Sequence, residues 1–137
     1  MEKMIEISHV SKSFQTYRAL DDISLDIEKG KIYGIIGRNG SGKTVLFKCI
    51  CGFLKTDSGE IKVDGKTIGK EIEAPQNAGI IIENPGFLPA YSGCQNLKFL
   101  ADINKKIGKR EIRDVLEKVG LDPTMKKPVG KYSLGMR

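Results

Sequence analysis

The 137-residue sequence predicts an α/β fold that begins with antiparallel strands. Apolar and polar residues alternate in Ile5–Ile7 and again in Ile23–Ile27, which is typical of half-exposed strands. Lys31–Ile36 is an almost unbroken apolar run, which predicts a strand buried on both faces. After a glycine-rich loop, Lys43–Ile50 has the apolar spacing of a helix. Strand, loop and helix in this order indicate the start of a parallel α/β core.

Two further segments predict strands. Gly59–Val63 and Lys66–Ile68 flank an Asp64-Gly65 turn and predict a hairpin. Ala78–Ile82 is a second short apolar run between turn residues, and it predicts another buried strand. The expected architecture is therefore a parallel core flanked by antiparallel pieces.

The last third of the chain is predicted to be helical. Apolar residues recur at helical spacing from Cys94 to Asn104, and Arg110–Val119 predicts an amphipathic helix that ends at Gly120. The apolar face of this second helix consists of Ile112, Val115, Leu116 and Val119. A chain of this length holds at most one domain. We divide it into residues 1–92, with the strands and the glycine-rich loop, and residues 93–137, the helical part.

The glycine-rich loop carries the strongest functional signal. Gly37–Thr44 matches G-x-x-x-x-G-K-[ST], the phosphate-binding loop (P-loop) of nucleoside triphosphatases. Its glycines let the backbone approach a polyphosphate, so that successive N–H groups face the phosphate oxygens. Lys43 can reach the β- and γ-phosphates, and the Thr44 hydroxyl can bind a phosphate-bound Mg²⁺. The predicted site comprises Gly37, Arg38, Asn39, Gly40, Ser41, Gly42, Lys43, Thr44 and Val45.

The charge of the chain does not indicate a nucleic-acid-binding protein. The net charge is +6, and basic residues concentrate in Lys105–Arg110 and at Lys126 and Lys127. These stretches lack interleaved aromatic residues that would stack on bases, so we interpret them as a solvated surface. Contact with anionic lipid headgroups or with an acidic partner is the alternative. No apolar run has the roughly 20 residues that span a bilayer, so we expect a cytoplasmic location.

Several segments together resemble the ATP-binding subunits of ATP-binding cassette (ABC) transporters: Val10–Phe14, Ala19–Leu25 and Gly30–Gly37. The resemblance extends over essentially the whole chain and implies a P-loop nucleoside triphosphate hydrolase core of the ABC type, with ATP and Mg²⁺ as ligands. It further implies that Phe14 stacks on the adenine, with Tyr17 as the alternative. Stacking tolerates any base, so it does not decide between ATP and GTP.

Ile80–Pro85 resembles the Gln loop of the family, with Glu83 where glutamine is usual. A carboxylate near a triphosphate is repelled unless Mg²⁺ lies between them, so Glu83 is a candidate metal contact, direct or through water. Glu83 and the segment that follows it resemble the corresponding segment of the subgroup associated with bacitracin resistance and lantibiotic immunity. That resemblance implies export of a peptide antibiotic or a similar amphiphile.

Tyr132–Met136 resembles a diverged form of the signature motif of the family. In the family this motif opens a helix whose N-terminus faces the γ-phosphate bound by the other subunit of a head-to-tail dimer, which makes Ser133 and Gly135 the phosphate-facing residues. The resemblance thus implies two partners, a second ATP-binding subunit and a membrane subunit, and a position at the inner face of the cell membrane.

The resemblance also implies parts that this chain does not contain. The family continues into the Walker B strand, which ends in Asp-Glu, and then to a switch histidine, whereas no apolar run ending in Asp-Glu follows Gly37. We therefore expect a fragment of a longer coding sequence with no complete catalytic set. The alternative is a nucleotide-binding module or inert remnant that does not hydrolyse ATP. A third interpretation, a DNA-repair P-loop ATPase, would require a long insertion between the two halves.

Overall fold

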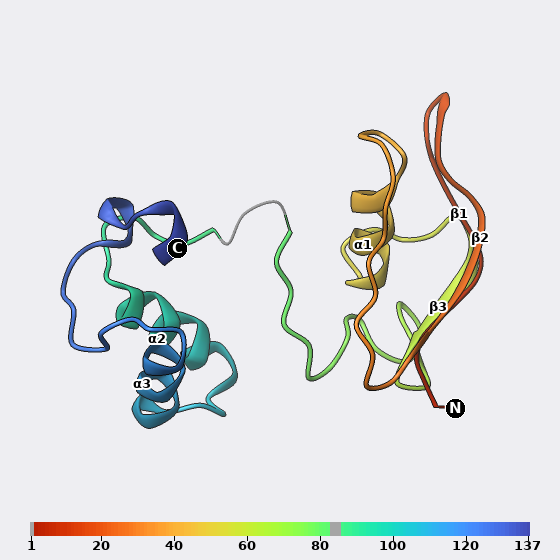
Figure 1. Cartoon of the computed structure of the whole chain (residues 1–137). Coiled ribbons are helices and arrows are strands. Elements are labelled where there is room, and N and C mark those ends of the chain that lie inside the picture. Colours follow the sequence, from red (N-terminus) through yellow and green to blue (C-terminus); the bar gives the residue numbers. More distant parts are fainter. Residues whose placement is uncertain (1, 83–85) are drawn as a thin grey trace. The chain divides into compact units, whose positions relative to one another are not determined.

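The computed structural model describes residues 2–82 and 86–137, and of Asn104 the backbone alone. The chain divides into two compact units, Met1–Glu83 (unit 1) and Asn84–Arg137 (unit 2). Unit 1 contains a sheet with one helix, and unit 2 contains the other helices (Figure 1). Each unit is described by itself.

A four-stranded antiparallel sheet forms most of unit 1. Its strands are β1 (Lys3–Phe14), β2 (Tyr17–Glu28), β3 (Ser58–Val63) and β4 (Lys66–Thr67), in the order β2-β1-β3-β4. The two alternating N-terminal segments form β1 and β2, and the predicted hairpin forms β3 and β4. At its turn, Asp64 and Gly65 have φ angles of 49° and 80°, which a tight hairpin turn requires. These predictions are confirmed.

Gly59 lets β3 approach β1 closely. Its φ is 79°, and a Cβ atom at this position would collide with the carbonyl oxygens of Ser8 and His9 on β1. No side chain can therefore occupy this position without moving one of the two strands. This glycine lies at the register shift of the β1–β3 ladder, between the pairs Ser8–Glu60 and Ser11–Ser58.

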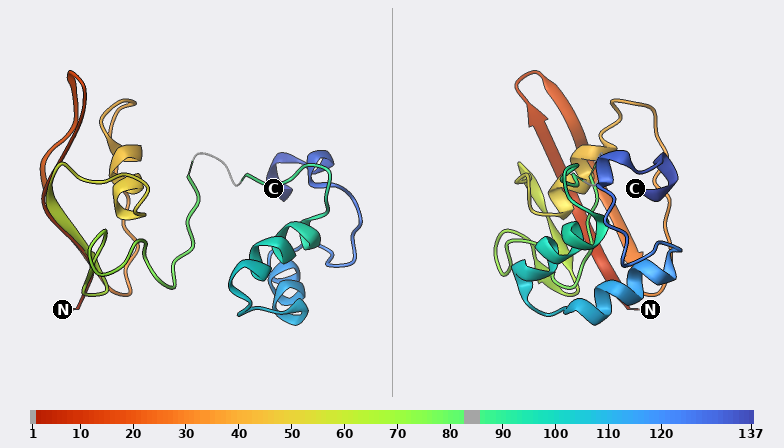
Figure 2. Two further views of the ribbon diagram at one scale, coloured as in Figure 1. Left: turned by 180° about the vertical axis from the view of Figure 1, so that it is seen from behind. Right: turned by 90° about the vertical axis from the view of Figure 1, so that its left-hand side faces the viewer.

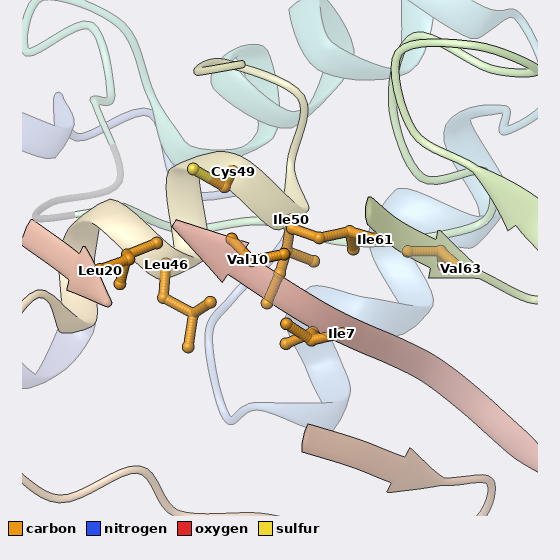
Figure 3. Packing of buried hydrophobic residues seen from close by; sticks show 8 residues of the cluster. All are labelled: Ile7, Val10, Leu20, Leu46, Cys49, Ile50, Ile61 and Val63. Carbon is orange, nitrogen blue, oxygen red and sulfur yellow. The ribbon is translucent and has the colours of Figure 1, made fainter. Parts of the chain in front are cut away.

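Lys43–Ile50 forms helix α1, as predicted from its apolar spacing, and the helix packs against the sheet. Leu46, Cys49 and Ile50 are its buried residues, and they meet the core side chains of the strands (Figure 3). The eight residues of this core are Ile7, Val10, Leu20, Leu46, Cys49, Ile50, Ile61 and Val63. Because the core joins β1, β2, β3 and α1, it fixes the start of α1 relative to the sheet.

The two buried strands predicted at Lys31–Ile36 and Ala78–Ile82 are not present. Neither segment belongs to a strand, and Ile32 and Ile36 are fully exposed. A parallel strand exists only when a neighbour bonds to its backbone. No neighbour pairs with Lys31–Ile36 within residues 2–82, so the apolar pattern alone does not produce a strand there.

Unit 2 consists of two helices that contact each other and two short 3₁₀ turns (Figure 2). The helices are α2 (Gly93–Asn104) and α3 (Lys109–Lys118), and the turns are η1 (Val129–Lys131) and η2 (Leu134–Met136). Ser92 caps α2, since its hydroxyl accepts a hydrogen bond from the Gln95 N–H while the Gln95 side chain accepts one from the Ser92 N–H. Within the described residues, no helix is long and apolar enough to cross a membrane.

Only part of the predicted apolar face of α3 is buried. Ile112 and Leu116 are buried, whereas Val115 and Val119 are exposed. Gly120 ends the helix as predicted, with a φ of 84° and an N–H that donates to the Glu117 carbonyl oxygen at 3.0 Å. The buried stripe is narrower than predicted because no described element of unit 2 covers Val115 and Val119.

Candidate nucleotide-binding site

The loop between Lys31–Ile36 and α1 has the backbone of a phosphate cradle. It turns at Arg38–Ser41, where the Ser41 N–H donates to the Arg38 carbonyl oxygen at 3.0 Å. Gly40 and Gly42 have φ angles of 82° and 96°, which residues other than glycine rarely adopt. Space around Gly40 is open, since a Cβ atom there would meet nothing within 4 Å.

Gly42 anchors the end of the loop on the sheet. It is buried, and a Cβ atom there would overlap the carbonyl oxygen of Ala19 and lie 3.2 Å from Cδ2 of Leu20. Both neighbours belong to β2 and Leu20 belongs to the core. The last glycine of the motif is thus required for packing, and it places the first turn of α1 directly beside β2.

The N-terminus of α1 is a site suited to an anion. Leu46 N–H makes the first bond of the helix, to the Gly42 carbonyl oxygen at 2.9 Å. No side chain caps the helix, and in the described part of the chain no carbonyl accepts from the N–H groups of Lys43, Thr44 and Val45. The first turn has no acidic residue. These N–H groups and the helix dipole both favour a negatively charged ligand.

Lys43 lies across this cradle. Its half-buried side chain reaches back so that the ammonium donates a hydrogen bond to the carbonyl oxygen of Gly37, at the other end of the loop. Gly37 is itself tightly packed, since a Cβ atom there would lie 2.5 Å from Oγ of Ser41. Thr44 is exposed beside Lys43. An ammonium, a hydroxyl and free N–H groups fit a triphosphate carrying Mg²⁺.

Phe14 and Tyr17 lie at the turn of the β1–β2 hairpin, where they form the last pair of the ladder. The Tyr17 hydroxyl donates a hydrogen bond to the carbonyl oxygen of Gly40 in the loop. Phe14 remains 41% exposed. The structure therefore brings this pair of aromatic residues to the loop. Sequence reasoning missed the contact between Tyr17 and Gly40, because no local pattern links a hairpin turn to a loop more than 20 residues away.

The signature-like segment belongs to unit 2. Tyr132 is buried, and its hydroxyl accepts a hydrogen bond from the Gly93 N–H at 3.1 Å at the start of α2. Ser133 follows in the N-cap position of η2, and Gly135 is exposed within that turn. Ser133 and Gly135 are thus held together, in a different unit from the loop. Glu83, the predicted metal contact, lies outside the described residues.

Comparison with known proteins identifies the family of this chain. Residues 20–137 match the family model described as ABC transporter. The chain is 40% identical over 134 residues to the uncharacterized ABC transporter ATP-binding protein YybJ of Bacillus subtilis (strain 168), covering 98% of this chain and 62% of that protein. It is 36% identical over 138 residues to the bacitracin transport ATP-binding protein BcrA of Bacillus licheniformis, covering 100% of this chain and 45% of that protein.

Among solved structures, the chain is similar to cbiO1 from Clostridium perfringens, described as part of the ABC transporter complex cbiONQ. The TM-score is 0.77 at 26% identity, and the match covers 97% of this chain and 57% of cbiO1. The chain therefore spans between 45% and 62% of the length of these relatives. It belongs to the family of ABC transporter ATP-binding proteins, and its fold is part of the P-loop ATPase core of that family.

Proposed function

We propose that this chain binds the triphosphate of ATP, with Mg²⁺, on Gly37–Thr44, as the nucleotide-binding part of a transporter ATPase subunit. ABC ATPases bind ATP, typically with Mg²⁺. The observation that carries the proposal is the Lys43 ammonium folded onto the Gly37 carbonyl across uncapped N–H groups of α1. A triphosphate would take the place of that carbonyl as the partner of Lys43.

Each residue of the loop has a distinct role in this proposal. The N–H groups of Gly40 and of Gly42 to Val45 would hold phosphate oxygens, and Lys43 would neutralise the charge on the β- and γ-phosphates. The Thr44 hydroxyl would be the protein ligand of Mg²⁺, with Glu83 as a second contact in the sequence-based proposal. The exposed ring of Phe14 would stack on the base, with the exposed ring of Tyr17, bonded to the loop through its hydroxyl, as the alternative.

We propose two partners for the whole protein. A second ATP-binding subunit would place its Ser133 and Gly135 against the γ-phosphate in a head-to-tail dimer. A membrane subunit would couple ATP binding to export, and the similarity to a bacitracin transport protein supports a peptide antibiotic as the cargo. A position at the inner face of the membrane follows from that partnership.

The charge distribution supports a position next to a membrane. Unit 1 has twelve basic and twelve acidic residues, whereas unit 2 has eleven basic and five acidic ones. The entire net charge of +6 therefore belongs to unit 2. All the ion pairs lie between residues 2 and 64, so the described cations of unit 2 have no ion pairs within the described residues. Unpaired cationic side chains are attracted to anionic headgroups.

We further propose that the 137-residue chain binds ATP without turning it over. Hydrolysis in P-loop ATPases needs a residue that orients the attacking water, and the sequence after Gly37 contains no apolar strand ending in Asp-Glu to supply one. Purified chain with ATPase activity that Lys43→Ala abolishes would refute this part of the proposal.

Calorimetric titration with ATP and Mg²⁺ tests the binding proposal. We expect Lys43→Ala to weaken binding at least about tenfold, because a charged hydrogen bond contributes about 1.5–3 kcal/mol. Lys55→Ala is the matched control, since Lys55 is an exposed lysine of unit 1 outside the loop. Equal affinities of the two variants would contradict the assignment of the site to this loop.

A further inference from the structure

Lys12 is an unusually buried lysine at the end of β1, close to the loop-facing turn of the hairpin. Only 16% of its side chain is exposed, and its Nζ lies 3.4 Å from Oδ1 of Asp57. Lysine is rarely buried unless it is paired, because its ammonium is costly to remove from water. The pair joins two parts of the chain that lie 45 residues apart in the sequence.

Asp57 also holds the backbone of β1. Its Oδ2 accepts a hydrogen bond from the Ser13 N–H at 2.7 Å, and its own N–H donates to the Ser11 carbonyl oxygen at 2.9 Å. The Ser13 hydrogen bond is the main cause that lowers the pKa of Asp57, and Lys12 and Arg18 act in the same direction. The carboxylate is therefore charged at neutral pH and fixes the residues on both sides of Lys12.

The held ammonium lies over the ring of Phe14, with Nζ 5.4 Å from the ring centroid. A cation at this distance is attracted to the face of an aromatic ring. Two consequences follow for the ring. The contact restricts rotation of the ring, and since Phe14 is 41% exposed, a base can approach the part of the ring that Lys12 does not cover.

We propose that Lys12 and Asp57 are positioning residues for the base of the nucleotide. Asp57 holds Lys12, Lys12 holds the Phe14 ring, and the ring offers its free face to a purine base. This inference rests on the proposed function, namely that the loop binds the triphosphate of the same nucleotide. It gives the two lysines different roles: Lys12 acts on binding of the base, and Lys43 acts on binding of the phosphates.

The test compares two ligands on the full chain, ATP with Mg²⁺ and inorganic tripolyphosphate with Mg²⁺, by calorimetry. Lys12→Met keeps the aliphatic stem and removes the charge. We expect it to weaken ATP binding about two- to fivefold, the effect of a partly exposed cation–ring contact, and to leave tripolyphosphate binding unchanged. Asp57→Asn should change affinity in the same direction, and Lys55→Met, near Asp57 in the sequence, should change neither affinity.

A double-mutant cycle locates the effect on the ring. In a Phe14→Leu background, Lys12→Met should weaken ATP binding no further, because the ring through which it acts is gone. Equal weakening of ATP and tripolyphosphate, or full additivity with Phe14→Leu, would overturn the inference while leaving the proposed function standing. If unaltered chain bound neither ligand, the proposed function would fail and this inference with it.

Discussion

The Tyr17 hydroxyl donates a hydrogen bond to the carbonyl oxygen of Gly40, and so ties the turn of the β1–β2 hairpin to the phosphate-binding loop. Gly40 has a φ of 82° and open space around it, and a second hydrogen bond, from the Ser41 N–H to the Arg38 carbonyl oxygen, closes the same turn. Because Tyr17 is the ladder partner of Phe14, the same contact sets where the exposed ring lies relative to the loop.

Tyr17→Phe should loosen the loop without unfolding the sheet. The change removes one hydrogen bond, worth about 0.5–1.5 kcal/mol, and keeps the ring. We expect faster amide hydrogen exchange at Ser41 and Gly42. Tyr33→Phe is the control, since the Tyr33 hydroxyl accepts a hydrogen bond from the Glu28 N–H away from the loop. Equal rates of amide exchange at the loop in both variants would argue against a hydrogen bond between Tyr17 and Gly40.

Gly59→Ala should destabilise unit 1 more than Gly65→Ala. Both glycines have φ near 80°, so alanine is strained at each by about 1–3 kcal/mol. Only at Gly59 would the added Cβ also collide with β1, whereas Gly65 has open space. Urea unfolding of the two variants measures the difference. Equal losses of unfolding free energy would show that β3 does not approach β1 as described.

Asp57 should make the free energy of unfolding of unit 1 depend on pH in the acid range. Its pKa in the folded chain lies below the ordinary value of 3.8, so its contribution is fully present well above 3.8 and disappears as the pH falls through the folded pKa. Unaltered chain should therefore be more stable than Asp57→Asn at neutral pH, and the difference should shrink as the pH falls through the lowered pKa of Asp57. A difference independent of pH in urea titrations would contradict this.

Unit 2 should bind anionic vesicles. We expect Lys105→Glu combined with Lys106→Glu to weaken binding to vesicles containing phosphatidylserine by at least about tenfold, since each lysine near such a surface contributes about 1 kcal/mol. Lys55→Glu with Lys70→Glu makes the same charge change on exposed lysines of unit 1. If both double variants lost binding equally, net charge alone and not its position would explain the attraction.

The sequence predicted the elements whose causes are local. The Asp64-Gly65 turn, the spacing of Leu46 and Ile50 on α1 and the Gly120 helix end depend on neighbours within a few residues, and the structure confirms them. The strand expected at Lys31–Ile36 depends on backbone partners from elsewhere, which an apolar pattern cannot supply.

The same distinction applies to the site. The G-x-x-x-x-G-K-[ST] pattern predicted the loop residues directly, because their chemistry is contained in eight consecutive positions. The contacts from Tyr17 to Gly40 and from Lys12 to Asp57 join residues distant in sequence, and they exist only once the hairpin has folded beside α1 and β3. No local signal marks either pair.

The most direct test of the account follows the backbone amides of the full chain by NMR while ATP and Mg²⁺ are added. We expect the largest shifts on Gly40, Gly42, Lys43 and Thr44, whose N–H groups would meet the phosphates, and we expect Lys43→Ala to need at least about tenfold more ATP for the same shifts. Shifts confined to residues outside Gly37–Val45, or an ATP concentration at half-maximal shift that is the same in Lys43→Ala, would contradict this binding site.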